Sequence, residues 1–263
     1  MADATQRFDD GAAYERFMGQ WSRAVGVKFL DWVDAPDHAA WLDVGCGTGI
    51  FTQLVLEACA PGSVIAVDPE TAQIEHARRQ SVARRAEFRV GDAQNLPFAN
   101  GTFDVVASAL VINFVPDRNR ALSEMRRVGQ PGGIVCGYVW DFAAEASPSW
   151  PMRVGLQNVG VHIADRPGTE DSSIDALRGL LAGAGLEDVA TTSFEVTVPF
   201  SDFDDFWSAQ TPSFSPITKK LAAMTDAERS SVRESVRRLL PDTRDGRIAY
   251  AARANAWKAR IAG

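Results

Sequence analysis

The stretch Trp41-Leu-Asp-Val-Gly-Cys-Gly-Thr-Gly-Ile50 decides the fold. An apolar run leads into three glycines that alternate with other residues, and the apolar positions that follow recur at helical spacing. Glycine lets the backbone approach a ligand without a Cβ clash, and the N-terminus of a helix favours an anionic group. The stretch therefore predicts a buried strand, a ligand-binding turn and a helix, with a purely structural tight turn as the alternative.

The spacing of these glycines indicates the class of ligand. A dinucleotide-binding turn has glycine at its first, third and sixth positions. Gly45 and Gly47 fit that pattern, but the sixth position is Ile50 and the third glycine is Gly49. A carboxylate just before the turn, Asp43, would repel a pyrophosphate but can hold an ammonium group directly or through water. A cationic amino-acid nucleoside therefore fits better than a dinucleotide.

Two further carboxylates follow the next two predicted strands. Asp68 closes the run Val64–Val67, where a carboxylate can accept hydrogen bonds from both hydroxyls of a ribose. Asp92 follows the run Glu87–Val90, where it can accept a hydrogen bond from an adenine amino group while Ala93 offers a backbone N–H. A helix cap at the first acid and a plain turn at the second are the alternatives. Three acids at three successive strand ends are more specific than any one of them.

The wider chain alternates short apolar runs with helical stretches. Such alternation predicts βαβ units and a parallel sheet covered on both faces. The predicted strands are Trp41–Val44, Val64–Val67, Glu87–Val90, Val105–Leu110, Ile134–Val139 and Glu187–Val198. The predicted helices are Phe51–Ala60, Glu70–Arg79, Asp117–Val128, Ser173–Ala184, Phe203–Ala209 and Thr225–Leu240. The fold class is therefore α/β, with a Rossmann-like doubly wound sheet.

Both ends of the chain extend this pattern. The segment Ala13–Val33 predicts one or two amphipathic helices, with Gly19 and Gly26 as candidate bends. In the C-terminal half, Trp150–Ala164 is expected to be an irregular or helical insertion. The final pattern, Arg247–Trp257, fits a strand or a helix, and a strand is favoured because one sheet position is left to fill.

Together these motifs resemble the class I S-adenosylmethionine-dependent methyltransferases, in particular the type 11 branch that includes the ubiquinone and menaquinone biosynthesis methyltransferases. The resemblance covers residues 41–140 closely and takes in Phe103-Asp-Val-Val-Ala-Ser-Ala-Leu110, Val111-Ile-Asn-Phe-Val-Pro-Asp117, Leu122-Ser-Glu-Met-Arg-Arg-Val128 and Pro131-Gly-Gly133. The opening Tyr14-Glu-Arg-Phe-Met-Gly-Gln-Trp-Ser22 resembles a narrower group of bacterial members. Many relatives carry histidine after the fourth strand, where this chain has Ile112-Asn113-Phe114.

The resemblance implies one domain with a seven-stranded, mostly parallel sheet whose last strand is antiparallel. Residues 1–38 would form a helical lid, residues 39–140 the cofactor-binding core, and residues 141–263 the acceptor-side insertion and final strands. S-adenosyl-L-methionine would be the cofactor. Its expected contacts are Tyr14 and Met18 on the lid, Asp43, Gly45, Cys46, Gly47 and Gly49 at the methionine part, Asp68 and Pro69 at the ribose, Asp92 and Ala93 at the adenine, and the Ala109 carbonyl at the amino group.

Methyl transfer from a sulfonium is an in-line displacement, so positioning can supply most of the rate, and a base is needed only if the acceptor must lose a proton. The candidates are Asn113 and Asp141, which follow the fourth and fifth strands, and His162 in the insertion. Asn113 can orient an acceptor but cannot act as a base. Aromatic residues near the same rim would line an apolar or aromatic acceptor pocket, with ordinary packing as the alternative: Trp21, Phe114, Trp140, Trp150, Phe206 and Trp207.

Bulk composition limits the class of partner. A net charge of −7 gives no basic footprint for a nucleic acid, so we expect a small-molecule acceptor. Three widely spaced cysteines fit reduced thiols better than disulfides or a zinc site, and no metal is expected. No apolar run approaches the ~18 residues of a membrane span, and the polar first segment is no signal peptide. We therefore expect a cytoplasmic protein.

Two other functions stay open at this point. A nicotinamide-dependent oxidoreductase shares the fold, but Ile50 in the place of the third required glycine and Asp43 before the turn count against it. A non-catalytic protein that binds an adenosyl ligand would keep the same three carboxylates.

Overall fold

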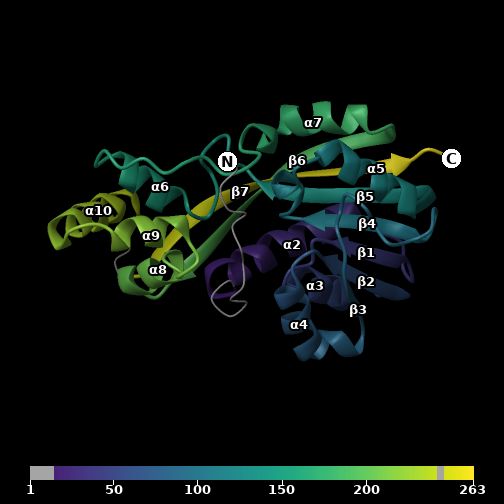
Figure 1. Ribbon diagram of the computed structural model, residues 1–263, viewed down its shortest axis with the longest axis horizontal. Helices are drawn as coiled ribbons and strands as arrows, with labels where there is room; N and C mark the ends of the chain where they lie inside the picture. The colour runs from purple at the N-terminus through teal and green to yellow at the C-terminus, as the bar shows by residue number, and fades with distance from the viewer. Residues whose placement is uncertain (1–14, 242–245) are drawn as a thin grey trace.

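The computed structural model of the protein describes residues 15–241 and 246–263. Within them, one seven-stranded sheet has the strand order β3-β2-β1-β4-β5-β7-β6 (Figure 1). The strands are β1 (Ala40–Val44), β2 (Ser63–Asp68), β3 (Glu87–Val90), β4 (Phe103–Ala109), β5 (Gly129–Trp140), β6 (Leu186–Phe200) and β7 (Ile248–Ile261). Strands β1 to β5 are parallel, and β7 lies antiparallel between β5 and β6. The predicted fold class and the final antiparallel strand are confirmed.

Helices cover both faces of the sheet, which is why its central strands are apolar on both sides. On β1, Trp41 belongs to one buried cluster and the next residue, Leu42, to the other. One face carries α2 (Gln20–Val33), α3 (Ile50–Ala58) and α4 (Thr71–Arg79), and the opposite face carries α5 (Arg118–Val128) and α7 (Ile174–Gly183) (Figure 1). With both faces covered, a ligand can reach the sheet only at the ends of its strands.

The N-terminal helical segment lies against the first of these faces. A π-helix, η1 (Glu15–Gly19), leads directly into α2 at Gly19, so the expectation of one or two helices in this segment is confirmed. At Gly26, the other candidate bend, α2 continues without a break. A Cβ at Gly26 would lie 2.5 Å from the Leu54 side chain, so glycine here allows α2 and α3 to approach closely.

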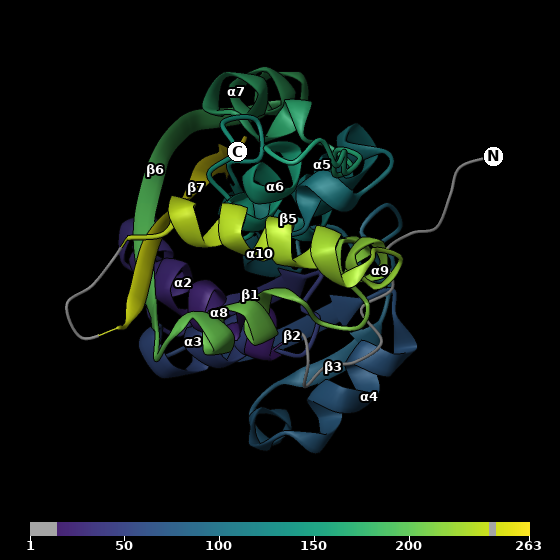
Figure 2. The ribbon, with the colours of Figure 1, turned by 90° about the vertical axis from the view of Figure 1, so that its left-hand side faces the viewer.

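Strands β6 and β7 extend past the sheet into a second group of helices, which we call the helical lobe (Figures 1 and 2). It contains α6 (Trp150–Gln157), α8 (Phe203–Gln210), α9 (Pro216–Ala222) and α10 (Asp226–Leu239). Tyr250 on β7 lies among these elements, and its ring contacts the rings of Trp21, Trp150, Phe200 and Phe206. Because α2 supplies one of these rings, the lobe shares a core with the rest of the chain, which supports the proposal of a single domain.

The remaining helices follow their sequence signals closely. Each helix predicted above appears within two residues of its expected ends, and Thr225 and Glu228 form a capping box at α10. The hydrophobic pattern did not predict α9, although Ser215 as N-cap and Pro216 as first residue are a helix-start signal. Short turns are η2 (Ser81–Arg84), η3 (Ile112–Phe114) and η4 (Glu170–Ser172). In residues 15–241 and 246–263, every helix is too short or too polar to cross a membrane.

Candidate cofactor and acceptor site

The glycine turn between β1 and α3 is hydrogen-bonded to the neighbouring strand of the sheet. Gly45, Gly47 and Gly49 have φ angles of +80°, +54° and +89°, which residues with a Cβ rarely adopt. The N–H groups of Gly45 and Cys46 both donate to the Val67 carbonyl on β2, at 2.7 and 3.0 Å. A Cβ on Gly45 would collide with Val111, whereas a Cβ on Gly47 would project into open space. The turn therefore leaves room for a ligand above Gly47.

Asp68, the last residue of β2, connects this turn to the start of α4. Its Oδ2 accepts a hydrogen bond from the Gly47 N–H and its Oδ1 one from the Glu70 N–H, each at 2.9 Å. Burial raises the pKa of Asp68, and these two N–H groups oppose the rise. The N-cap of α4 is Glu70, so the alternative role of Asp68 as that cap is wrong. Each carboxylate oxygen can accept a second hydrogen bond, from a ligand hydroxyl.

Asp43 lies beneath the turn and does not line its surface. Its side chain is 1% exposed, and its Oδ2 accepts a hydrogen bond from the Thr52 hydroxyl at 2.6 Å. Its Oδ1 has no hydrogen-bond partner among the described residues. Burial raises the pKa of Asp43 to about 7. The hydrogen bond from Thr52 opposes this rise, and the nearby negative charge of Asp68 adds to it. A cationic ligand above the turn would therefore act on Asp43 through its charge and not by contact.

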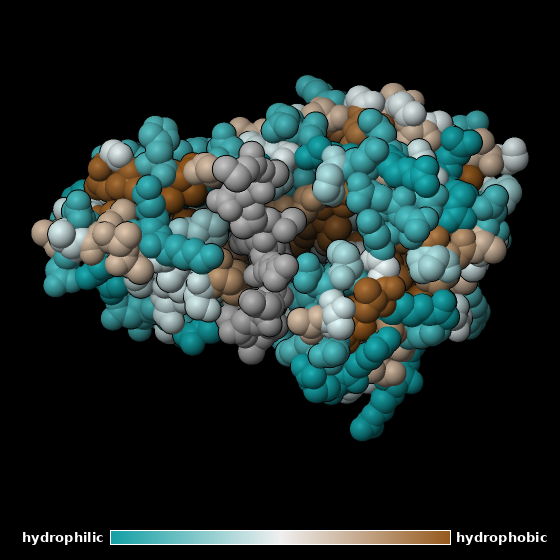
Figure 3. Space-filling view, viewed as in Figure 1, coloured by the Kyte–Doolittle hydropathy of each residue, from teal (hydrophilic) through white to brown (hydrophobic). Residues whose placement is uncertain are grey.

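A cavity of about 280 Å³ opens above the turn, at the carboxyl ends of β1, β2, β4 and β5. The strand order reverses between β1 and β4, and open α/β sheets bind their ligands at such a point. A recess with apolar walls is visible near the middle of the face in Figure 3. The predicted site residues that line the cavity are Met18, Gly45, Cys46, Gly47, Asp68, Pro69, Ala109, Asn113, Phe114 and Trp140.

The predicted polar residue at the acceptor end is Asn113, in η3 after β4. It is 1% exposed, and its Nδ2 donates to the Pro167 carbonyl at 3.4 Å. Its Oδ1 accepts no hydrogen bond from the described residues, although it is buried. A buried acceptor without a donor is costly, so a ligand N–H or O–H would be bound well here.

Phe17, Phe142 and Arg166 are among the cavity residues that were not predicted from the sequence. Phe17 lies beside Met18 on η1, and its ring contacts Phe214 edge-on at 6.1 Å between centroids. Phe142 follows β5 by two residues, and its place after a central strand was a signal that could have identified it. Arg166 lies in the irregular segment after α6, where no pattern in the sequence indicates a site.

Several residues predicted to contact the cofactor lie outside the cavity lining. Gly49 is the N-cap of α3, and a Cβ there would lie 3.1 Å from the Phe88 ring. Asp92 is exposed and accepts a hydrogen bond from the Gln94 N–H at 2.9 Å, which forms the turn given above as its alternative. Ala93 is buried next to it. Tyr14 lies outside the described residues. The adenine contacts of Asp92 and Ala93 stay predictions, for which the exposed turn beyond β3 leaves space.

The predicted acceptor pocket needs a larger correction. Trp21 packs edge-on against Trp140, and Trp150 donates from its ring N–H to the Ala251 carbonyl at 3.1 Å. Both lie in the core around Tyr250, as does Phe206, whereas Trp207 lies on α8 under the Arg233 guanidinium. These four aromatic residues, Trp21, Trp150, Phe206 and Trp207, serve packing and not the cavity.

Two of the three catalytic candidates are also placed elsewhere. Asp141 is buried, and its Oδ2 forms an ion pair with Arg253 at 2.8 Å, so this carboxylate is paired with a cation within the fold. His162 is exposed and outside the cavity lining. No histidine is among the described residues that line the cavity, which leaves Asn113 as the candidate that reaches it.

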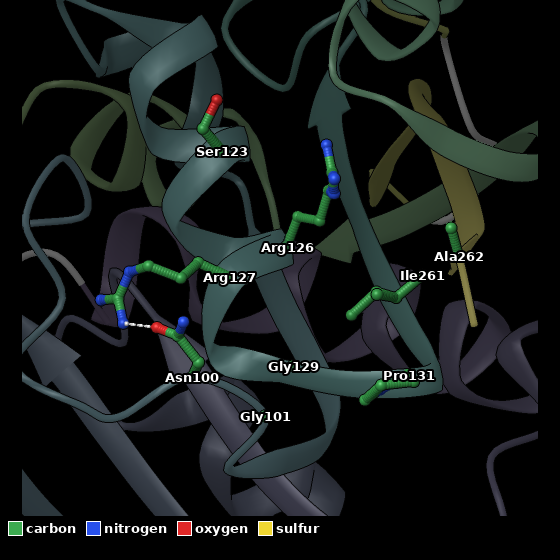
Figure 4. A pocket seen from close by; sticks show the side chains of 9 residues that line it. All are labelled: Asn100, Gly101, Ser123, Arg126, Arg127, Gly129, Pro131, Ile261 and Ala262. Carbon is green, nitrogen blue, oxygen red and sulfur yellow. Dashed lines mark hydrogen bonds between the residues drawn. The ribbon is translucent and has the colours of Figure 1, made fainter.

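A second, more open hollow of about 620 Å³ lies at the opposite edge of the sheet, between α5 and the end of β7. Figure 4 shows that its two arginines, Arg126 and Arg127, point in different directions. Arg126 donates to the Ala184 carbonyl at 3.2 Å, and Arg127 donates to Glu124 and Asn100. These arginines connect neighbouring elements, and none of the predicted site residues lines this hollow. The smaller cavity is therefore the candidate functional site.

Part of the chain is similar to known methyltransferases. Residues 42–137 match a family model described as a methyltransferase domain. The malonyl-[acyl-carrier protein] O-methyltransferase of Pectobacterium atrosepticum is 34% identical over 146 residues, which are 55% of this chain and 56% of that protein. The demethylmenaquinone methyltransferase of Lactiplantibacillus plantarum is 41% identical over 105 residues, 38% of this chain and 44% of that protein. The chain thus spans about half the length of these curated relatives.

Solved structures show the same fold over nearly the whole chain. A phosphoethanolamine N-methyltransferase of Haemonchus contortus in complex with S-adenosyl-L-methionine superposes with a TM-score of 0.60 at 17% identity. The match covers 99% of this chain and 59% of that one. The likeness therefore extends into the helical lobe, beyond the segment that the family model matches.

Proposed function

We propose that this chain, which carries a methyltransferase domain at residues 42–137, transfers a methyl group from S-adenosyl-L-methionine to a small organic acceptor. The observation that carries the proposal is the glycine turn, which is hydrogen-bonded to Asp68 at the mouth of an otherwise largely apolar cavity. The turn would hold the amino-acid part of the cofactor, and Asp68 the ribose. The aromatic end of the cavity would hold the acceptor.

The residues present fit this cofactor better than a dinucleotide. The space above Gly47, where a Cβ would meet nothing within 4 Å, suits a ligand that lies directly on the backbone. Two carboxyl groups, Asp43 and Asp68, lie below and beside the turn, and their pKa values are raised by burial. A cation would stabilise their charged forms, whereas a pyrophosphate would add a like charge. S-adenosyl-L-methionine supplies an electrophilic methyl group on a sulfonium when bound.

The chain itself contributes position and a dry, shaped site. Phe17 and Met18 on η1 line the cavity together with Trp140 and Phe142 at the end of β5. Asn113 Oδ1 can accept a hydrogen bond from the acceptor and fix the direction of its attacking atom. The carboxyl groups among the described cavity residues, Asp68 and Glu70, lie at the cofactor end, so an acceptor that needs no deprotonation fits this site best.

Titration calorimetry against three ligands tests the proposed cofactor. We expect S-adenosylmethionine and S-adenosylhomocysteine to bind and NAD to give no measurable heat, because the turn lacks the dinucleotide spacing and has two acids beside it. Tight binding of NAD with no heat from either adenosyl ligand would overturn the proposal. Incubating metabolite extracts with a methyl-labelled cofactor then separates an enzyme from a protein that only binds, since only an enzyme transfers the label.

The proposed lid gives a separate prediction. Phe17 and Met18 are buried and line the cavity, although the π-helix that carries them spans only Glu15–Gly19. We expect S-adenosylhomocysteine to slow amide hydrogen exchange across residues 17–22, because a bound cofactor would hold this short helix against the turn. Helix α10, which is remote from the cavity lining, is the internal control. Equal protection of residues 17–22 with and without ligand would reject the lid.

A further inference from the structure

Asn113, the polar residue at the acceptor end of the cavity, is fixed in place by its backbone. It belongs to η3, directly after β4, and is 1% exposed. The Arg118 guanidinium on α5 donates to its carbonyl at 3.0 Å. Gly168 packs so closely on the same carbonyl that a Cβ there would lie 2.4 Å from its oxygen. A residue positioned in this way loses little entropy when it binds a ligand.

The side-chain amide of Asn113 has one defined orientation. Its Nδ2 donates to the Pro167 carbonyl at 3.4 Å. The reversed amide would turn its oxygen toward that carbonyl, and two acceptors cannot form a hydrogen bond. The Oδ1 atom is therefore the free end, and it accepts no hydrogen bond from the described residues. A ligand recovers the cost of this buried acceptor only by donating an N–H or an O–H to it.

The groups around Asn113 limit which donor can also accept a methyl group. Phe17, Trp140 and Phe142 line the same cavity, so an aromatic molecule fits its walls. Among the described residues of the lining, the carboxyl groups are Asp68 and Glu70, near the glycine turn, and no residue is a histidine. A donor that is bound by Asn113 therefore has neither a carboxylate nor an imidazole at the same end of the cavity to remove its proton.

A hydroxyl and an amine differ in their need for such a base. A hydroxyl oxygen is a weak nucleophile until its proton is removed. A neutral amine attacks with its lone pair and keeps an N–H for Asn113 throughout. An alkylamine, like the lysine side chain with its pKa of about 10.4, is protonated at neutral pH and has no lone pair to use. An amine on an aromatic ring is neutral there, because the ring delocalises the nitrogen lone pair.

We propose that the acceptor is a neutral aromatic amine with at least one N–H, which Asn113 Oδ1 binds. This inference rests on the proposed function. The amine nitrogen forms a bond to the methyl carbon while the carbon–sulfur bond of the sulfonium breaks and its electron pair passes to sulfur. The additional proton on nitrogen then leaves to water. Primary and secondary amines therefore react, whereas a tertiary amine offers Asn113 no N–H and is not methylated further.

Binding to the protein saturated with S-adenosylhomocysteine tests the contact to Asn113. The probes are aniline and 1-naphthylamine, each also as its N-methyl and N,N-dimethyl compound. In at least one series we expect the N-methyl compound to bind about tenfold or more tightly than the N,N-dimethyl compound. In Asn113→Leu this preference should fall to about twofold or less, with the affinity for S-adenosylhomocysteine unchanged. The matched control is Asn119→Leu, at an exposed position on α5 outside the cavity lining, which should behave as wild type.

Transfer of a labelled methyl group tests the same proposal on the wild type alone. In at least one series the label should enter the primary and N-methyl amines but not the N,N-dimethyl compound, nor phenol or 1-naphthol. The proposal is overturned if wild type lacks the preference for an N–H, if Asn113→Leu keeps it, or if no amine is labelled. Label in the tertiary amine, or in the hydroxyl compound in place of the amine, would also overturn it. Failure of every adenosyl ligand to bind would instead overturn the proposed function.

Discussion

Asp68→Ala should weaken the binding of S-adenosylmethionine by about a hundredfold. If the carboxylate accepts hydrogen bonds from both ribose hydroxyls, the variant loses two bonds to a charged group, each contributing roughly 1.5–3 kcal/mol and not fully additive. A combined loss of about 3 kcal/mol corresponds to about a hundredfold in Kd. Asp68→Asn should fall between wild type and alanine, because one amide oxygen remains while the NH2 group faces a backbone N–H of Gly47 or Glu70.

The same two backbone contacts mean that Asp68→Ala also lowers the melting temperature, so melting alone cannot identify the role of the carboxylate. Asp104→Ala is the control, since its Oδ2 accepts a hydrogen bond from the Ala40 N–H at 2.7 Å outside the cavity lining. This variant should lose stability and keep its affinity. The decisive comparison is between adenosine and 2′,3′-dideoxyadenosine. Wild type should prefer the ligand with hydroxyls, and Asp68→Ala should not. An equal preference in both proteins would remove the ribose assignment.

The parts of the site that could be predicted lie where backbone and side-chain pattern agree. The turn Gly45–Gly49 contains three glycines, which adopt positive φ more readily than residues with a Cβ, and it follows a strand that is apolar on both faces. Strand ends in a parallel sheet meet at one edge, so Asp68, Ala109 and Trp140 reach one cavity although they lie far apart in sequence. Local rules of this kind transfer directly from sequence to structure.

The acceptor end follows from tertiary packing, which sequence spacing does not express. Trp21, Trp150 and Phe206 resemble pocket residues by composition, but β7 places Tyr250 among them and uses them as core. Arg166 lies in a segment without periodicity, and its guanidinium contacts Ser149 and Phe142 from other parts of the chain. Aromatic residues were thus overassigned to the pocket, and a charged one was missed.

A second large effect is expected in the pH dependence of cofactor binding. Asp43 is buried with a pKa of about 7, so below that pH it is mostly protonated in the free protein. A cation bound above the turn favours the charged carboxylate and lowers this pKa, so binding releases a proton. By linkage, affinity should rise by up to about tenfold per pH unit between about pH 5.5 and 7, and then level off. Adenosine, which carries no cation, should show a much smaller slope.

Asp43→Asn isolates this contribution from Asp68, whose pKa is also raised by burial. The amide cannot titrate, but its oxygen can still accept the hydrogen bond from Thr52. In the free wild-type protein the folded state holds a proton that the unfolded state has lost, so stability falls as pH rises from about 4 to 7. The melting temperature of the variant, measured relative to wild type, should therefore be higher at pH 8 than at pH 5. Its cofactor affinity should also lose most of its pH dependence. If the cofactor affinity of wild type and of Asp43→Asn depends on pH in the same way, the role of Asp43 is only to accept the hydrogen bond from Thr52. The charge that selects the cofactor must then come from Asp68.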